Sequence, residues 1–408
     1  MGARRRDSVG VVAGNRREFL VRGAASLLWL AGAPLVAGCR GGGGGGSAAA
    51  GSNIDDFVLE APDANGLQLP QGFRSRVVAR SGERPVAASA YTWHDAPDGG
   101  AVFASDDGGW VYVSNSEISN GLGGVGALSF APDGSVRDAY PILAGTSRNC
   151  AGGATPWGTW LSCEEVDGGQ VHECDPEGLA AASVRPELGA FNHEAVAVDP
   201  DSQVLYLTED EPDGRLYRFV PAGRRGDGTP EYAGGSLEVA EMRGATGGPV
   251  LWHALSDPSG ASVPTRRQVA VSTAFDGGEG IAWHDDVVYF STKGDDRVWA
   301  YDLQLEEIDL LYDRASSPTP ILRGVDNVTV SPWGDVLVAE DGGNQEIVAL
   351  TPQGGVVPVV RVVGHPQSEV TGPAFDPSGT RLYFSSQRGA AGQSSDGVTY
   401  EVEGPFGG

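Results

Sequence analysis

Gly-Gly-Trp-Val-Tyr-Val-Ser-Asn-Ser-Glu (residues 108–117) is the first copy of a pattern that determines the fold of this 408-residue chain. In each copy, a turn with Gly or Asp precedes four or five alternating apolar residues, and a polar or acidic end follows them. The pattern returns at residues 158–165, 203–210, 286–293, 334–341 and 381–387. Alternation of this kind is typical of a β-strand with one buried face.

The spacing of these copies indicates the architecture. The apolar runs begin near residues 111, 159, 204, 287, 336 and 382, with separations of 48, 45, 83, 49 and 46 residues. Repeats in the forties are typical of four-stranded propeller blades. We therefore predict an all-β fold, a six-bladed β-propeller with an insertion between blades. The long separation holds either an extra blade or an insertion, and the Gly, Arg and Pro content of residues 212–273 favours an insertion.

Potential metal ligands recur at equivalent places in this repeat. A further predicted strand precedes the run in four blades and begins with Cys150, Glu194, Glu279 or the pair Asp326-Asn327. Successive strands of a blade are antiparallel, so the start of one lies beside the end of the next. The separations agree, with 14 residues from Cys150 to Glu164, 15 from Glu194 to Glu209 and 13 from Asn327 to Glu340. We expect a ring of carboxylates at one mouth of the central channel.

Such a ring needs cations. A single acidic pair is more simply a solvated loop charge, but carboxylates that converge repeatedly would repel one another strongly without counter-charge. Calcium, which takes six to eight oxygen ligands, suits the carboxylates. Cys150 could add a thiolate, which favours a transition metal; the alternatives are a buried thiol or a disulfide partner. Cys163 and Cys174 could form a disulfide, or Cys163 could remain a buried thiol.

The N-terminal region is typical of an export signal. Arg16 and Arg17 precede an apolar run at residues 24–37 that is too short to span a bilayer, as in twin-arginine signals. The run ends in Leu-Val-Ala-Gly-Cys, which matches a lipobox and makes Cys39 the predicted lipidation site; the alternative is a plain signal peptide. We predict a signal peptide at residues 1–38, a Gly-rich tether at 39–56 and the propeller domain at 57–408. The protein would be lipid-anchored to the outer face of the cell membrane or periplasmic.

Composition limits the possible partners. The chain carries 28 basic and 54 acidic residues, a net charge of −26, which argues against binding of nucleic acid. Its 62 glycines fit many tight turns between strands. We expect a monomer that contacts the membrane only through its lipid anchor.

Long motifs then show a resemblance to a known family. Asn-Cys-Ala-Gly-Gly-Ala-Thr-Pro-Trp-Gly-Thr-Trp-Leu-Ser-Cys-Glu-Glu (residues 149–165) closely resembles the signature of the PhoX family of bacterial alkaline phosphatases. The stretches at residues 193–200, 206–221, 278–282, 325–335 and 339–343 resemble its later motifs, in the same order. The first blade departs from the family, with Asn115-Ser116-Glu117 where Asn-His-Glu is usual.

The resemblance implies a six-bladed propeller exported by the twin-arginine route that hydrolyses phosphate monoesters. It also implies two ferric ions with a cysteine thiolate ligand and two to three calcium ions. The implied metal ligands are Cys150, Glu117, Glu164, Glu165, Glu194, Glu209, Asp210, Glu279, Asn327, Glu340 and Asp341. The predicted catalytic residues are Cys150, Glu194, Lys293 and Arg388, of which Lys293 and Arg388 would contact the phosphate of a small phosphomonoester.

Two alternative functions belong to other classes. Propellers with calcium at the channel also act as lactonases or arylesterases, in which the metal polarises a carbonyl group. A non-catalytic surface propeller that uses calcium only for rigidity is the second alternative. Both leave Cys150 without a role.

Overall fold

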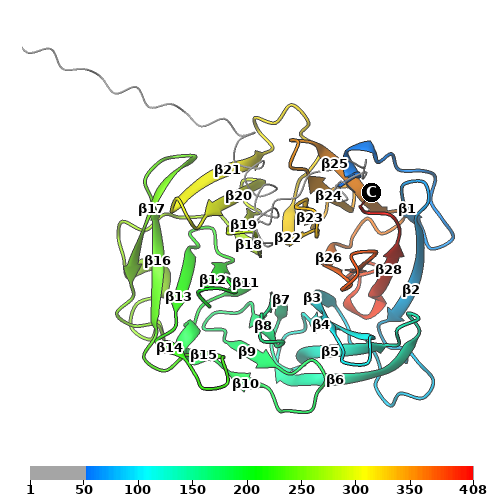
Figure 1. Cartoon of the computed structure of the whole chain (residues 1–408), viewed down its shortest axis with the longest axis horizontal. Helices are drawn as coiled ribbons and strands as arrows, with labels where there is room; N and C mark the ends of the chain where they lie inside the picture. The colour runs from blue at the N-terminus through cyan, green and yellow to red at the C-terminus, as the bar shows by residue number, and fades with distance from the viewer. Residues whose placement is uncertain (1–51, 408) are drawn as a thin grey trace, which may run out of the picture.

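The computed structural model describes residues 52–407 (Figure 1). The predicted signal peptide, its lipidation site Cys39 and most of the predicted tether lie outside these residues. Within the described part the chain forms β-strands and four short 3₁₀ helices and no α-helix, as the sequence predicted. None of these helices is long and apolar enough to cross a membrane. The 3₁₀ helices are η2 (Ile54–Asp56), η3 (Pro186–Leu188), η4 (Thr265–Arg267) and η5 (Ser394–Asp396).

Sheets surround a central axis in a propeller-like arrangement (Figure 1). Four of them are small. In each, the strands are given from the axis outwards. The first sheet consists of β3 (Pro97–Ala104), β4 (Trp110–Ser116), β5 (Gly123–Phe130) and β6 (Val136–Thr146), and the second of β7 (Asn149–Ala154), β8 (Trp160–Glu164), β9 (Val171–Cys174) and β10 (Ser183–Val184). The third consists of β22 (Val325–Val330), β23 (Val336–Glu340), β24 (Glu346–Leu350), β25 (Val356–Val362) and β1 (Leu67–Gln68), and the fourth of β26 (Val370–Phe375), β27 (Arg381–Ser386), β28 (Val398–Glu403) and β2 (Arg74–Arg80).

The remaining arc of the propeller is one nine-stranded sheet. Its order is β11 (His193–Val198), β12 (Leu205–Glu209), β13 (Leu216–Val220), β16 (Ser236–Met242), β17 (Gly247–Ala254), β21 (Glu307–Asp313), β20 (Arg297–Asp302), β19 (Val287–Thr292) and β18 (Gly278–His284). Both ends of this sheet lie at the axis, and β17 joins the two halves by pairing with β21. A two-stranded ribbon, β14 (Gly223–Arg224) with β15 (Pro230–Glu231), projects from it.

This topology corrects the predicted insertion at residues 212–273. The segment contains β13 and β16, which extend the β11–β12 ladder as its third and fourth strands. Only the β14–β15 ribbon, β17 and the loop that leads to β18 are additions to a four-stranded unit. The sequence could not reveal this division because the partner of β17 is β21, more than fifty residues further along the chain.

The inner strands β3, β7, β11, β18, β22 and β26 contact one another in a closed circle around the axis. Glycine allows this close approach. A Cβ atom on Gly99 of β3 would lie 2.5 Å from the Cα of Ala151 on β7. A Cβ atom on Gly280 of β18 would lie 2.3 Å from the backbone nitrogen of Val328 on β22. The radius of the circle therefore depends on these two glycines.

The first and last parts of the described chain close the circle. Strand β2 pairs with β28, so an N-terminal strand completes the sheet formed by the C-terminal ones. Residues 52–56, assigned above to the tether, pack on the domain instead. Ile54 is completely buried, and the Asn53 side chain donates a hydrogen bond to the Pro405 carbonyl. The domain therefore begins by residue 52, because this segment has its own apolar contact and hydrogen bonds.

The hydrophobic core is divided among the spaces between neighbouring sheets. One cluster joins Leu337 and Ile347 of the β22–β25 sheet to Phe384 and Tyr400 of the next. Stacking across such faces buries large apolar surfaces without filling the axis itself. The axis is thus left to the polar residues at the strand ends.

Candidate metal and phosphate site

Two residue positions in each repeat lie at one end of the central axis, here called the acidic end. The first is the residue that follows the second strand of each ladder. Its backbone N–H donates to the residue just before the inner strand at 2.8–3.2 Å in all six repeats. We call these residues the outer tier: Glu117, Glu165, Asp210, Lys293, Asp341 and Gln387.

The second position is the second residue of each inner strand. We call these residues the inner tier: Asp98, Cys150, Glu194, Glu279, Asp326 and Thr371. In all six ladders the register shifts just after the start of the inner strand. Such a β-bulge turns the backbone and re-aims side chains. The repeated bulge therefore explains how one sequence position supplies a side chain to the axis six times.

The two tiers bring possible metal ligands into contact. Four overlapping groups have ligand atoms within 4.8 Å of one another, and together they join Cys150 to eight carboxylates. The groups are Asp98–Glu117–Cys150, Cys150–Glu165–Glu194, Glu194–Glu279–Asp326 and Asp326–Asp341–Glu369. We refer to these nine residues as the ring. Cys150 is one of three free cysteines in the described chain, so neither the Cys163–Cys174 disulfide nor a disulfide at Cys150 forms.

Glu194 gives the strongest indication that a cation belongs here. Its side chain is completely buried, and neither carboxylate oxygen has a hydrogen-bond partner among the described residues. A buried carboxylate without a partner is costly, because it loses its hydration and gains nothing in return. Glu194 belongs to both the Cys150–Glu165 and the Glu279–Asp326 groups. Its environment, with a thiol among the ligand atoms on one side and carboxylate oxygens on both, fits bound cations.

Burial and mutual repulsion shift the pKa values of these acids upwards. Burial, with the charges of Glu279 and Glu165, raises the pKa of Glu194 well above its ordinary value. Burial and Glu117 raise the pKa of Glu165 to about 9, although Arg148 opposes them. Burial raises the pKa of Asp326 to about 6 against the lowering effect of Lys293. A bound cation would reverse these shifts, because it favours the deprotonated forms.

The Cys150 thiol has a raised pKa for the same reasons, burial first and then the charges of Asp98 and Glu194. A thiolate therefore does not form at Cys150 through the protein groups alone. A coordinated metal deprotonates a thiol outright. The thiol is thus suited to a ligand role and poorly suited to a free nucleophile.

Three basic side chains lie among the acids. Arg148 spans Glu117 and Glu165 at 2.8 and 2.5 Å. Arg388 contacts Glu369 at 3.0 Å and Asp341 at 3.4 Å. Lys293 belongs to the outer tier itself. The predicted catalytic residues Cys150, Glu194, Lys293 and Arg388 therefore all lie at the acidic end.

The structure does not bring every predicted ligand into the ring. Glu164, Glu209 and Glu340 are absent from the four groups, and other protein atoms use their oxygens. Glu209 accepts from Tyr217 at 2.7 Å and from Arg266 at 3.1 Å. Asn327 donates to the ring residue Asp326 at 2.8 Å. Asn327 also accepts the Gly372 N–H at 2.6 Å. Asp210 occupies an outer-tier position beside Glu165 without joining a group.

Two ring residues, Asp98 and Glu369, escaped the sequence analysis, and a third, Asp326, was noted beside Asn327 but left out of the predicted ligands. Repeat spacing could have found Asp326, which precedes Asp341 by fifteen residues, as Cys150 precedes Glu165. Asp98 precedes Glu117 by nineteen, because β3 and β4 are each longer than the corresponding strands of the other two repeats. Glu369 comes immediately before an inner strand, a position that holds no acid in the other repeats. No sequence signal indicated Glu369.

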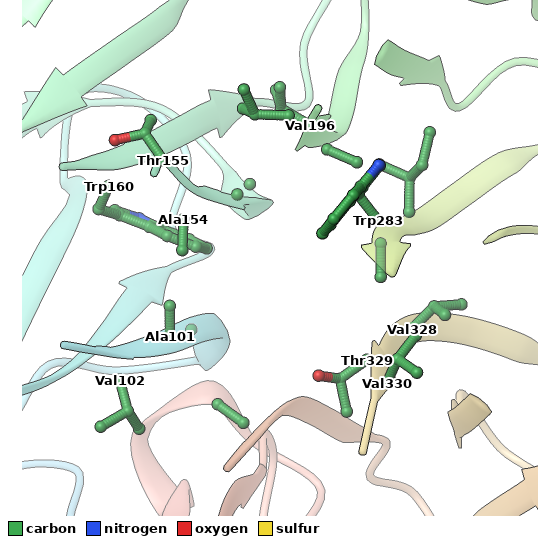
Figure 2. A pocket seen from close by; sticks show the side chains of 18 of the residues that line it. Ala101, Val102, Ala154, Thr155, Trp160, Val196, Trp283, Val328, Thr329 and Val330 are labelled. Carbon is green, nitrogen blue, oxygen red and sulfur yellow. The ribbon is translucent and has the colours of Figure 1, made fainter. Parts of the chain in front are cut away.

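The opposite end of the axis has a different character. A cavity of about 440 Å³ opens there, and Figure 2 shows Trp160, Val196, Trp283 and Val328 around it. Between this cavity and the ring lies only a small space of about 30 Å³, which is lined largely by glycine and alanine. An anion would find no charged group in the lining of the large cavity. A charged substrate would therefore reach the ring from the acidic end.

Fold and site together define the class: an all-β, propeller-like protein with clustered carboxylates and a thiol at one end of its axis. The sequence profile of alkaline phosphatase PhoX matches residues 124–177, 167–309 and 303–389, which is more than half of the chain. The chain belongs to the PhoX alkaline phosphatase family.

One similar solved structure supports the fold. The structure of Pseudomonas fluorescens PhoX in complex with vanadate, a transition-state analogue, has a TM-score of 0.68. Its sequence is 17% identical, and the match covers 85% of this chain and 97% of that one. A Xanthomonas campestris gluconolactonase, XC5397, is 12% identical over 87% of this chain and 97% of that one, with a TM-score of 0.47. No curated protein matches the chain.

Proposed function

We propose that the chain hydrolyses small phosphate monoesters at the ring, with metal ions bound by Cys150 and the carboxylates. The observation that carries this proposal is Glu194, which is completely buried, has no hydrogen-bond partner among residues 52–407 and is common to two of the four ligand groups. Its placement makes sense when cations lie on both sides of it. Membership of the PhoX family supports phosphate esters as the substrate class.

The expected ions are two Fe³⁺ and two to three Ca²⁺. The Cys150 thiolate suits the iron, and the carboxylate oxygens suit both. Such ions would neutralise charge on the phosphoryl oxygens and supply a bound hydroxide as nucleophile. Arg148 and Arg388 would hold the phosphate at the entrance, since guanidinium groups pair well with phosphate oxygens.

We further propose that the nine-stranded sheet counts as two blades, which would make the propeller six-bladed. Its two halves carry the same tier positions as the four small sheets. Export by the twin-arginine route and lipid attachment at Cys39 remain part of the proposal, on the sequence features given above. They suit an enzyme that acts on phosphate esters outside the cytoplasm.

The direct test combines turnover with metal analysis. Purified protein is assayed with p-nitrophenyl phosphate and, separately, with gluconolactone, before and after chelation, and its iron and calcium are quantified. Phosphatase activity that chelation removes is the expected result. A fully iron-loaded protein without phosphatase activity would refute the proposal, and lactone hydrolysis with calcium alone would favour the lactonase alternative.

The thiol ligand has its own test. Cys150→Ala is expected to lose iron and to lower kcat by about 100-fold or more. The effect should be larger than that of removing a group that only hydrogen-bonds to a metal ligand, because Cys150 would bind the metal directly. Cys174→Ala is the matched control, because Cys174 is also a free cysteine but lies in β9, outside the four ligand groups. Equal iron contents in the two variants would show that Cys150 is not a ligand.

A further inference from the structure

Lys293 is the only lysine in the chain. It occupies the outer tier, where the other five repeats carry Glu117, Glu165, Asp210, Asp341 and Gln387. A cation thus stands at a position that otherwise holds acids or an amide.

The Lys293 ammonium contacts three carboxylates. Its Nζ lies 3.0 Å from Glu279 Oε1, 3.1 Å from Asp341 Oδ2 and 3.6 Å from Asp326 Oδ2. These acids come from β18, from the end of β23 and from β22, so the contacts cross two neighbouring units of the propeller. An ammonium group has three N–H donors, and here it faces three oxygen partners.

The choice of lysine has a physical reason. An ammonium is a compact point charge, whereas a guanidinium is a wide planar fork. Arg148 illustrates the difference: its Nη2 contacts both Glu117 and Glu165 while its Nε also donates to Glu117, so the planar group serves only two acids. Arg266 reaches three acids through three different nitrogens, whereas Lys293 reaches its three acids through one nitrogen, as a metal ion would.

We propose that the Lys293 ammonium occupies one cation position of the ring, in place of a metal ion. The arc of Glu279, Asp326 and Asp341 is then neutralised by the protein itself. Metal ions bind on the opposite arc, which consists of Asp98, Glu117, Cys150, Glu165 and Glu194. This inference rests on the proposed metal site and specifies which part of the ring takes the ions.

Removal of the ammonium should open a divalent cation site. Lys293→Gln and Lys293→Met, made in the full chain, are expected to bind about one more calcium ion than the unaltered protein in equilibrium dialysis. Their melting temperature should also rise more on addition of calcium. Arg137→Gln is the matched control, because it removes the same charge from an exposed pair with Asp107, outside the ring.

An unchanged calcium count in both Lys293 variants would overturn the inference; a raised KM with that count would assign Lys293 to phosphate binding instead.

The unaltered protein provides a second measurement that needs no variant. Acetic anhydride can modify only one lysine side chain here, so mass spectrometry reports its accessibility directly. The Lys293 side chain is 34% exposed, but its ammonium pairs with three carboxylates, so it should react slowly with and without calcium. Exposure on calcium loading would show that a metal ion displaces it. The metal content of the unaltered protein separately tests the proposed function.

Discussion

Adjacent acids at the strand ends have different tasks. Glu164 accepts the backbone N–H groups of Ser147 at 2.9 Å and of Gln170 at 3.3 Å. Glu340 does the same with Arg323 and Glu346 at 3.0 and 3.1 Å. In both repeats the acid accepts one N–H from two residues before the inner strand and a second N–H from the residue six positions after itself. It thereby links the start of the inner strand to the segment that follows the second strand. The next residue in each repeat, Glu165 or Asp341, belongs to the ring, since successive residues point in opposite directions.

This division predicts opposite results for neighbouring substitutions. Glu164→Gln should destabilise the chelator-treated protein by about 1–3 kcal/mol, because an amide nitrogen would face a backbone N–H, yet metal content should persist. Glu165→Gln should cost less without metal, because the raised pKa of Glu165 disfavours its charged form and a Gln side chain still offers Arg148 an oxygen acceptor. It should instead lower metal content. Urea unfolding and metal analysis of both variants provide the check, and metal loss in Glu164→Gln would contradict the assignment.

The sequence revealed that acids gather at one end of the axis, but it did not separate these two tasks. Repetition placed both Glu164 and Glu165 at the strand end, and either could have faced the axis. The answer depends on the bulge after the start of the inner strand, which shifts the register between β7 and β8. No residue type marks such a bulge reliably. For the same reason Asn327 was chosen over Asp326.

The inner strand is the element on which the ring depends. Its bulge aims one side chain at the axis, and in five of the six inner strands the next residue is Gly or Ala, which lets the neighbouring strand approach. Gly280 directly follows the inner-tier residue Glu279 and faces the backbone of β22. The spacing between inner strands therefore sets the distances between ligands.

Gly280→Ala tests this dependence. The new Cβ would lie 2.3 Å from the Val328 nitrogen, a backbone atom that cannot move without its strand. Overpacking of this kind typically costs about 1–3 kcal/mol, and the separated strands should also bind metal more weakly. Gly226→Ala is the control, because a Cβ atom there would have no other atom within 4 Å and its φ is ordinary. Calorimetric melting and calcium titration measure both effects; equal behaviour of the two variants would rule out a spacing role.

At the scale of the whole molecule, closure of the propeller brings together acids whose charges repel one another. The pairing of β2 with β28 fixes the circumference and forces the acids of all repeats together. Repeat spacing predicted the radial plan well, since each second strand lies where the pattern placed it. It could not predict β17 or the role of residues 52–56, because these depend on contacts between segments distant in the sequence.

The crowded acids should make stability depend on both pH and metal. A carboxyl with a higher pKa in the folded chain stabilises it fully below its unfolded pKa, and that contribution disappears as pH rises through the folded value. In the metal-free chain burial raises Asp326 to a pKa of about 6, Glu209 and Glu340 to about 7, and Glu165 to about 9. The free energy of unfolding should therefore fall steadily between about pH 4 and pH 9.

Bound cations should remove most of this slope, because they stabilise the deprotonated carboxylates that the empty ring disfavours. Lys293 does not compensate within this range, since its raised pKa keeps the ammonium charged throughout. The stabilisation gained from calcium should consequently be larger at about pH 9 than at about pH 5, which suits an enzyme that works under alkaline conditions. Urea unfolding at both pH values, with chelator and with saturating calcium, measures the four free energies. A metal-free chain that is more stable at the higher pH would show that the ring acids are not held together as the structure places them.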